Sequence, residues 1–366
     1  AGNSKDPRET AKKLYEWVST KITYAGNCIG LGAVVPRDLD VVLDNRMGDC
    51  KDHATLLQAL LKARGIDSTQ ALINAAGTYT LPDIPVASVV NHVINYIPSL
   101  DLYVDSTAAT VPFGSLPDGA AGKPVLLVDG HRDGATTPVT QAGTEWQKLR
   151  TTLRIQPDGS VKGTQRVEVS GRMAVAARAQ FRNMGAGDAD KLVRGYFRGN
   201  ALTANGKLRY DDPVPMLETF NLDADFDVDR MIPTSGGFQV QPWFLSFTPV
   251  SMLVASQLGD PDQPQGESSC GAYHSDEEYT FEFPSTMRII AVPKDVSLRE
   301  GTLSYVSTFR QEGARLLVRR TLDDRTPGPV CSPEYNEGFA RVMRRIMPDL
   351  RAQVVYLTET EGSAPQ

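Results

Sequence analysis

Apolar residues recur at intervals of three and four positions in two segments near the N-terminus, and this spacing predicts two amphipathic helices. Asp6 is a suitable N-cap for the first helix, and Gly65 is a suitable C-cap for the second. The buried face of the first helix would comprise Ala11, Leu14, Tyr15 and Val18. That of the second would comprise Leu56, Leu57, Leu60 and Leu61.

A run of β-branched residues at 88–96 is followed by a Pro-Ser turn at 97–100 and a second short run at 101–107. This pattern predicts a β-hairpin. Two more strands are expected at residues 68–74 and 125–128. We therefore expect the first third of the chain to pack helices against an antiparallel sheet.

Strand patterns predominate in the rest of the chain. Two hairpins are predicted where alternating strands flank short glycine-containing turns, at 149–155 with 161–169 and at 303–309 with 315–322. Other strands are expected at 280–283, 288–292 and 352–357, and helices at 172–182, 188–197 and 333–346.

A segment rich in glycine, threonine and proline at 133–143 separates the two regions and is typical of a linker. We predict an α+β protein with a first domain at residues 1–133, a linker at 134–145 and a second domain at 146–366. The second domain is expected to be mostly β and sandwich-like, with a few helices.

Composition narrows the class of protein. The chain has 366 residues, 41% of them hydrophobic, which is enough for two domains with cores of their own. A net charge of −6 argues against nucleic acid as a partner. No apolar run approaches membrane-span length. Because the chain begins at Ala1 without a signal peptide, we expect a processed product whose export signal or membrane anchor lies outside it.

Cys50 is the first candidate for chemistry. It lies where a Gly48-Asp49 turn leads into the second predicted helix. A thiol at the first helical turn is near the positive end of the helix dipole, which favours the nucleophilic thiolate. Free cysteine is also one of the residues most often buried, so the position alone is compatible with a nucleophile or a structural thiol.

His92 and Asp105 make the catalytic interpretation stronger. They fall on the two predicted strands of the 88–107 hairpin, where residues of an antiparallel pair are direct or diagonal neighbours. A carboxylate that orients an imidazole beside a thiol is the arrangement needed for nucleophilic catalysis.

Three sequence blocks resemble the bacterial transglutaminase-like superfamily: Gly48-Asp49-Cys50-Lys51-Asp52, Asn91-His92-Val93 and Tyr103-Val104-Asp105-Ser106-Thr107. More narrowly, they are similar to the Gram-negative group in which this core accompanies domains of unknown function. The resemblance covers roughly residues 8–130. It implies a papain-like core in which Cys50 is the nucleophile, His92 the general base and acid, and Asp105 the orienting carboxylate.

Two positions are candidates for stabilising an oxyanion. The backbone N–H of Cys50, at a helix start, is one possible donor. A second donor would come from the 24–32 loop, with Tyr24 and Asn27 as candidates, although a structural role for Tyr24 is equally compatible. Asp49 is expected to lie near the site as the cap of the helix.

His53 departs from the family pattern, which does not require histidine at this position. It follows Cys50 by three residues and would be near it on a helix. We expect a histidine on the helix surface close to the site. A rival base, or a zinc ligand together with Cys28, Cys50 and His92, is a weaker alternative, and no metal or cofactor is predicted.

The predicted function is acyl transfer from an amide through a thioester on Cys50, with a protein or peptide as substrate. The resemblance favours hydrolysis, as in a cysteine peptidase or amidase. A protein-crosslinking transglutaminase with an amine acceptor is one alternative. A non-catalytic binding module on the same fold is another, and a redox sensor with a reversible Cys28–Cys50 bridge is a third.

Two other cysteines, Cys270 and Cys331, lie in loops of the second predicted domain. Their placement suggests a disulfide, and a disulfide would indicate an oxidising compartment such as the periplasm. Cys28 is expected to be buried, since a permanent bridge to Cys50 would mask the nucleophile.

Overall fold

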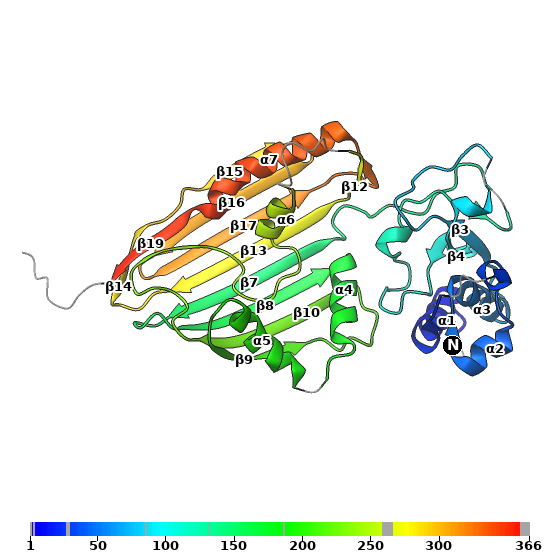
Figure 1. Cartoon of the computed structure of the whole chain (residues 1–366), viewed down its shortest axis with the longest axis horizontal. Helices are drawn as coiled ribbons and strands as arrows, with labels where there is room; N and C mark the ends of the chain where they lie inside the picture. Colours follow the sequence, from blue (N-terminus) through cyan, green and yellow to red (C-terminus); the bar gives the residue numbers. More distant parts are fainter. Residues whose placement is uncertain are drawn as a thin grey trace, which may run out of the picture. The chain divides into compact units, whose positions relative to one another are not determined.

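The computed structural model describes residues 2, 4–26, 30–84, 86–130, 132–185, 187–257 and 266–358, which form two compact units (Figure 1). The first unit comprises Ala1–Thr140 together with Val214–Glu218. The second comprises Gln141–Pro213 together with Thr219–Gln366. Each unit has its own hydrophobic core.

The first unit combines helices with a small antiparallel sheet. Its helices are α1 (Pro7–Lys21), α2 (Leu39–Asn45) and α3 (Cys50–Lys62), with 3-10 turns η1 (Gly30–Ala33), η2 (Ala87–Val89), η3 (Pro98–Leu100) and η4 (Asp118–Ala120). The sheet has the order β5-β4-β3-β6 and contains β3 (Thr69–Ile73), β4 (His92–Ile97), β5 (Leu102–Val104) and β6 (Leu126–Leu127). A short parallel pair joins β1 (Thr23–Tyr24) to β2 (Met47–Gly48), and β2 directly precedes α3 in the sequence.

The apolar faces of α1 and α3 meet in the core of this unit. Tyr15 and Val18 of α1 cluster with Leu57 and Leu61 of α3, as the spacing of apolar residues predicts. Met216, from the short segment that belongs to this unit, joins the same cluster. A second cluster contains residues of β3, β4, β5 and β6. The helix that begins at Cys50 is therefore fixed by burial along its length.

An eight-stranded sheet dominates the second unit, in the order β15-β16-β17-β13-β7-β8-β10-β9. Its strands are β7 (Trp146–Ile155), β8 (Val161–Ser170), β9 (Ala204–Tyr210), β10 (Thr219–Val228), β13 (Tyr273–Glu282), β15 (Val296–Glu300), β16 (Leu303–Glu312) and β17 (Arg315–Asp324). Neighbouring strands are antiparallel except β13 and β7, which are parallel.

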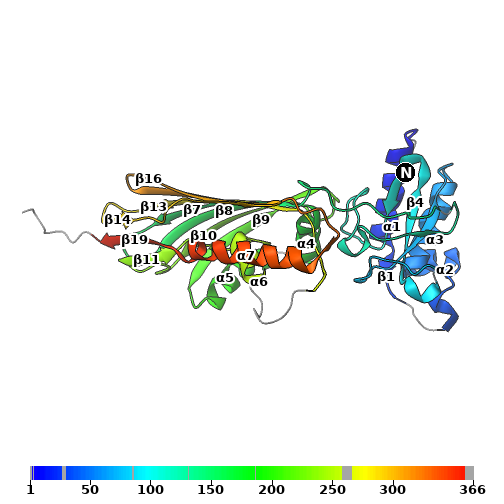
Figure 2. The same ribbon diagram turned by 90° about the horizontal axis from the view of Figure 1, so that it is seen from above.

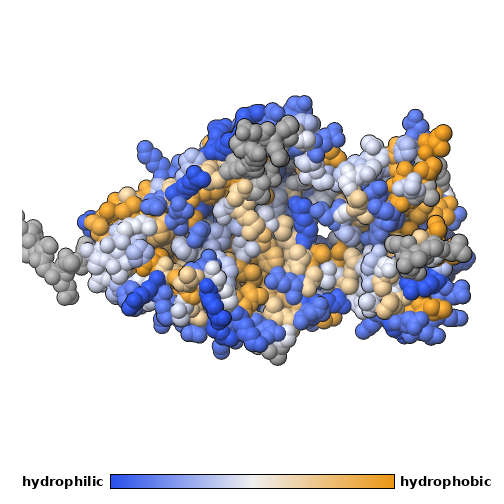
Figure 3. Space-filling view, viewed as in Figure 1, coloured by the Kyte–Doolittle hydropathy of each residue, from blue (hydrophilic) through white to orange (hydrophobic). Residues whose placement is uncertain are grey.

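One face of this sheet is covered and the other is left to solvent (Figure 2). The cover consists of a three-stranded sheet and four helices. The small sheet has the order β11-β19-β14, with β11 (Gly236–Gln239), β14 (Met287–Ala291) and β19 (Gln353–Thr358). The helices are α4 (Gly171–Phe181), α5 (Asp188–Gly199), α6 (Val250–Gln257) and α7 (Pro333–Arg351). The covered side is the one seen in Figure 3, where hydrophilic residues follow α7 and hydrophobic residues show between the helices.

The predicted α+β fold class is confirmed, with a helix-and-antiparallel-sheet core followed by a mostly-β region. The sandwich-like character of the second region comes from the small sheet, because residues of β11, β14 and β19 share a core with β7 and β13. Helices complete the covering layer, since α6 and α7 pack on β16 and β17. The second layer is thus made of both kinds of element.

The sequence patterns missed three strands of the large sheet, β9, β10 and β15. In β10, Phe220, Leu222, Ala224, Phe226 and Val228 alternate with polar residues and are buried. The period-two signal was therefore present, but aspartates, which are rare in strands, obscured it. Acidic residues likewise hid most of β13 (Tyr273–Glu282), which was expected only from residue 280.

Candidate functional site

Cys50 is the first residue of α3, and its helix start is closed by a capping box. The Asp49 side chain accepts hydrogen bonds from the N–H groups of Lys51 (3.2 Å) and Asp52 (3.4 Å). The Asp52 carboxylate in turn accepts the Asp49 N–H at 2.9 Å. These contacts pair the backbone N–H groups of Asp49, Lys51 and Asp52, which have no partner within the helix. The N–H of Cys50 takes no part in the capping box. Asp49 thus has the capping role expected of it, and its side chain also pairs with Lys51.

Gly48 leaves room for the side chain of Asp52 at the turn before Cys50. A Cβ on Gly48 would lie 2.8 Å from the Cβ of Asp52, closer than side-chain atoms approach. Asp52 is buried, and its carboxylate binds Arg37. Oδ1 accepts the backbone N–H of Arg37 at 2.7 Å, and Oδ2 lies 2.8 Å from the Arg37 Nη2 atom. Burial raises the pKa of Asp52, but the backbone hydrogen bonds and the Arg37 guanidinium outweigh this and hold the pKa below its ordinary value.

His92 connects the thiol to a carboxylate. Its Nε2 atom lies 2.7 Å from Oδ2 of Asp105. The Cys50 side chain interacts with the same imidazole and raises its pKa. Because Nε2 faces Asp105, Nδ1 is the ring nitrogen left for the sulfur. Since β4 and β5 pair Asn95 with Val104 and Tyr96 with Tyr103, His92 and Asp105 are diagonal neighbours at the open end of the hairpin. The structure therefore brings Cys50, His92 and Asp105 together in the predicted order.

The electrostatics of this group favour a charged imidazole. Burial lowers the pKa of His92, but the hydrogen bonds and negative charges of Asp105 and Cys50 dominate and raise it to about 10. Burial raises the pKa of Asp105, and the bonds from His92 and Thr107 overcome this and lower it. His92 is thus a cation at neutral pH, clamped between a carboxylate and a sulfur.

Two residues that support Asp105 were not recognised from the sequence. Thr107 donates to Oδ1 of Asp105 from its N–H (3.0 Å) and its hydroxyl (2.6 Å). The buried Tyr15 hydroxyl donates to the carbonyl of Val111 at 2.9 Å and lies 3.3 Å from that of Asp105. The Asp-x-Thr spacing is a signal for a side-chain-to-backbone turn and could have indicated Thr107. Tyr15 carries no such signal, because its contact spans distant parts of the chain.

His53 is not on the helix surface as expected but fully buried. The face of α3 that bears it turns toward the segment after β5, and its Nδ1 atom lies 2.9 Å from the carbonyl of Ser106. Burial is the main reason that its pKa is lowered. The pKa values of the two histidines are thus shifted in opposite directions, that of His53 downward and that of His92 upward.

Of Tyr24 and Asn27, the two candidates for the second oxyanion donor, the structure describes only Tyr24. Tyr24 pairs with Gly48 in the β1–β2 pair, and Gly48 is two residues before Cys50. The centre of the Tyr24 ring lies 6.1 Å from that of the His53 ring. The Tyr24 side chain is half exposed. Asn27 and Cys28 lie outside the described residues, so the second oxyanion donor stays a prediction.

The part of the chain that the structure describes contains no group of three or more His, Cys, Asp and Glu side chains that could hold a metal ion. Within the same residues, no helix has both the length and the apolar character of a membrane span. Cys270 and Cys331, the two loop cysteines expected to pair, are joined by a disulfide, whereas Cys50 is a free thiol.

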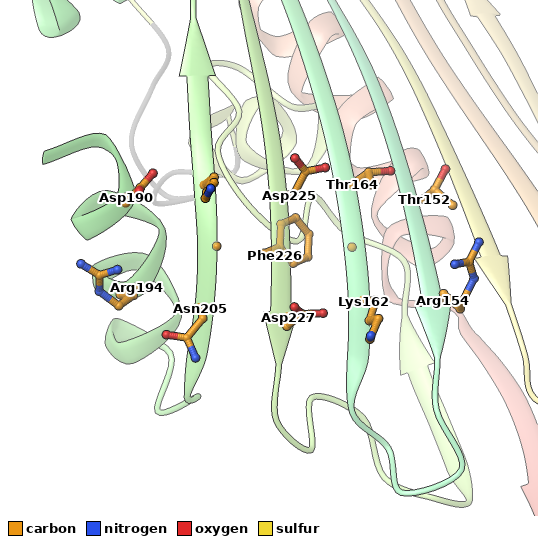
Figure 4. A pocket seen from close by; sticks show the side chains of 13 residues that line it. Thr152, Arg154, Lys162, Thr164, Asp190, Arg194, Asn205, Asp225, Phe226 and Asp227 are labelled. Atoms are coloured by element: carbon orange, nitrogen blue, oxygen red, sulfur yellow. The ribbon is translucent and has the colours of Figure 1, made fainter. Parts of the chain in front are cut away.

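A cavity of about 600 Å³ lies in the second unit and is lined by side chains from β7, β8, β9, β10 and α5 (Figure 4). Its lining contains charges of both signs, such as Arg154, Lys162, Asp225 and Asp227. No cysteine or histidine is among the lining residues. Catalysis needs a nucleophile within reach of a base, so the Cys50 group, and not this cavity, is the candidate active site.

Comparison with known proteins finds a family match within the first unit. Residues 1–97 match the model of the transglutaminase-like superfamily. This transglutaminase-like segment contains Cys50 and His92 and ends before Asp105, which the geometry alone adds to the site. The family that the sequence blocks resemble is thus confirmed for the segment that bears the thiol.

A solved structure from Parabacteroides distasonis, described provisionally as a protease, has a similar fold, with a TM-score of 0.55 and 13% sequence identity. The alignment covers 97% of this chain and 53% of the other, so this chain spans about half the length of that protein. At this identity the likeness concerns the fold, and it extends over both units. The curated proteins compared with the chain give no match.

Proposed function

We propose that the transglutaminase-like unit catalyses acyl transfer from an amide, with Cys50 as nucleophile, His92 as general base and acid, and Asp105 as the orienting carboxylate. One observation carries the proposal: the imidazole of His92 lies 2.7 Å from the Asp105 carboxylate and also interacts with the Cys50 side chain, which raises its pKa. A cationic His92 beside the sulfur stabilises the thiolate, and the fixed ring is ready to give its proton to a leaving group.

The reaction would proceed in two halves. The thiolate attacks the amide carbonyl, and the developing oxyanion is stabilised by the Cys50 N–H at the start of α3. His92 gives its proton to the amine nitrogen, the C–N bond breaks and a thioester remains on Cys50. An incoming water or amine then loses a proton to His92 and attacks the thioester, which releases the acyl group and restores the thiolate–imidazolium pair.

Hydrolysis is the preferred outcome, so we propose a cysteine peptidase or amidase acting on a protein or peptide. The provisional description of the P. distasonis structure as a protease is compatible with this. Crosslinking needs the same thioester but an amine acceptor, and the positions of Cys50, His92 and Asp105 suit both. We also propose an oxidising compartment such as the periplasm, which the Cys270–Cys331 disulfide supports.

The test uses fluorogenic peptide amides with the whole chain, and Cys50→Ala as the matched inactive variant. Intact mass spectrometry should detect an acyl adduct on Cys50 in the wild type and none in Cys50→Ala. Adding a primary amine separates the two outcomes, because a hydrolase yields the free acid and a transglutaminase yields the new amide.

Alkylation of Cys50 tests the non-catalytic alternative. At mildly acidic pH, iodoacetamide should modify the wild type quickly and His92→Ala slowly, since only the wild type has a cation beside the sulfur. Equal rates, with no amide turned over, would leave a binding module on an inherited fold.

A further inference from the structure

His53 joins two parts of the candidate site that come from different elements. It lies on α3, three residues after Cys50. Its Nδ1 atom lies 2.9 Å from the carbonyl oxygen of Ser106, a residue 53 positions further along the chain. Ser106 directly follows Asp105, so this single contact links the helix of the nucleophile to the turn that carries the carboxylate.

The partner of Nδ1 fixes the tautomer of His53. A carbonyl oxygen only accepts hydrogen bonds, so the proton is on Nδ1 and the imidazole donates it. Burial, which lowers the pKa of His53, keeps the ring neutral at pH 7. The second nitrogen, Nε2, then presents a lone pair, and this buried atom has no hydrogen-bond partner among the described residues.

This arrangement is poor for stability alone. A buried acceptor without a partner costs free energy, and an apolar residue of similar size would avoid that cost. It is also unsuitable for a rival base, because Nδ1 donates to Ser106 and Nε2 is buried without a hydrogen-bond partner among the described residues. The role left for His53 is to donate its Nδ1–H and thereby to position the turn at residues 105–107.

That turn is held from two sides. Within it, Thr107 fixes Oδ1 of Asp105. From outside it, His53 holds the carbonyl of the residue between them. Asn95 forms a similar hydrogen bond to the residue after His53. Its Nδ2 atom donates to the Ala54 carbonyl at 2.9 Å and so connects β4 to α3. The strand that bears His92 and the turn that bears Asp105 are therefore both anchored to the helix of Cys50.

We propose that His53 is a positioning residue of the active site, which acts through the hydrogen bond from Nδ1–H to the Ser106 carbonyl and sets Asp105 against His92. The inference rests on the proposed function for its effect on turnover. Its structural content, the tautomer and the tie to the turn, is independent of any substrate.

Two isosteric variants separate the two ring nitrogens. An asparagine amide nitrogen occupies nearly the place of Nδ1, whereas the glutamine nitrogen reaches the place of Nε2. We expect His53→Asn to retain kcat within about threefold, and His53→Gln and His53→Leu to lose up to about 100-fold, as small misplacements of catalytic groups do. Equal losses in His53→Asn and His53→Gln, or no loss in either, would overturn the proposal. Thermal unfolding of all three identifies a variant that merely fails to fold.

Nuclear magnetic resonance supplies a readout that does not need activity. Long-range ¹H–¹⁵N correlation should show His53 protonated at Nδ1, and the His92 proton shared with Asp105 should keep its downfield position in His53→Asn and lose it in His53→Gln. An Nε2–H tautomer, or a His92 proton that does not respond, would refute the role of His53 even in an active enzyme. An inactive wild type with the expected spectra would instead refute the proposed function and leave the tie intact.

Discussion

Thr107 occupies one oxygen of Asp105 and thereby reserves the other for His92. Both the N–H (3.0 Å) and the hydroxyl (2.6 Å) of Thr107 donate to Oδ1, while Oδ2 lies 2.7 Å from Nε2 of His92. A carboxylate held in this way cannot rotate without breaking three hydrogen bonds. The geometry of the acid–base pair is thus set by a residue two positions along the same turn.

Replacing Thr107 with valine should slow the chemistry while leaving the fold in place. Valine keeps the shape and the backbone N–H but removes the hydroxyl, and hydrogen bonds to charged groups contribute about 1.5–3 kcal/mol. We expect kcat to fall by roughly 10- to 100-fold, with KM little changed. Steady-state kinetics on a peptide amide measures this, with Thr107→Ser, which retains the hydroxyl, as the control. Similar losses in both variants would contradict the assigned role.

The charge state of His92 predicts a particular dependence of stability on pH. Its pKa is raised from 6.5 to about 10 in the folded protein, so its contribution is complete below pH 6.5 and is lost as the pH rises toward 10. Urea unfolding from pH 6 to 10 should show the wild type losing its advantage over His92→Gln across this window. Parallel curves for the two proteins would mean that His92 is not charged in the fold.

The contribution of Asp105 to stability depends on pH in the opposite direction. Its pKa is lowered from 3.8, so its contribution is present above that value and disappears as the pH falls through the lower folded pKa. Asp105→Asn should therefore resemble the wild type in stability only at acidic pH. The same urea series, extended to pH 2, measures this, and an advantage of the wild type that persists unchanged in acid would rule it out.

Gly48→Ala should disturb the start of α3. The new methyl group would lie 2.8 Å from the Cβ of Asp52, which is held in place by Arg37. Overpacking of this kind costs about 1–3 kcal/mol and should also displace Cys50. Denaturant unfolding and the alkylation rate of Cys50 measure the two effects. Gly77→Ala is the matched control, because nothing lies within 4 Å of its added Cβ.

Removing the disulfide should destabilise the second unit and leave the thiol chemistry intact. The bridge closes a loop with a sequence separation of 61, for which chain entropy predicts about 4 kcal/mol. The paired substitution of Cys270 and Cys331 by serine should lower the unfolding midpoint in calorimetry. Its Cys50 alkylation rate at 25 °C should equal that of the wild type. A fall in that rate would show that the bridge affects the site.

The site was more predictable than its supports. Cys50, His92 and Asp105 follow from local patterns, a helix start and a hairpin, each of which restricts where a side chain can lie. The burial of His53 does not, because it depends on which part of the chain covers α3. Arg37 and Tyr15 likewise act through contacts with distant segments, and nothing near them in the sequence indicates a partner.

In the large sheet, too, local sequence patterns did not indicate contacts between distant segments. Hairpins such as β7–β8 were recognisable from their turns, whereas the pairing of β7 with β13 joins strands that the sequence does not connect. The aspartates of β10 disguised a strand whose apolar alternation is complete. Local signals therefore identified most elements but not their neighbours.

The parallel pairing of β7 with β13 has a consequence for synthesis of the chain. The two strands meet across a separation of 128 residues, as in the Arg154–Glu282 contact. The middle of the sheet can close only after β13 has left the ribosome, when the transglutaminase-like segment is long complete. Until then the edge of β7 is open, and non-local closure of this kind is slow. The nascent β7–β8 hairpin therefore presents an unpaired strand edge, which favours aggregation, until β13 has been synthesised.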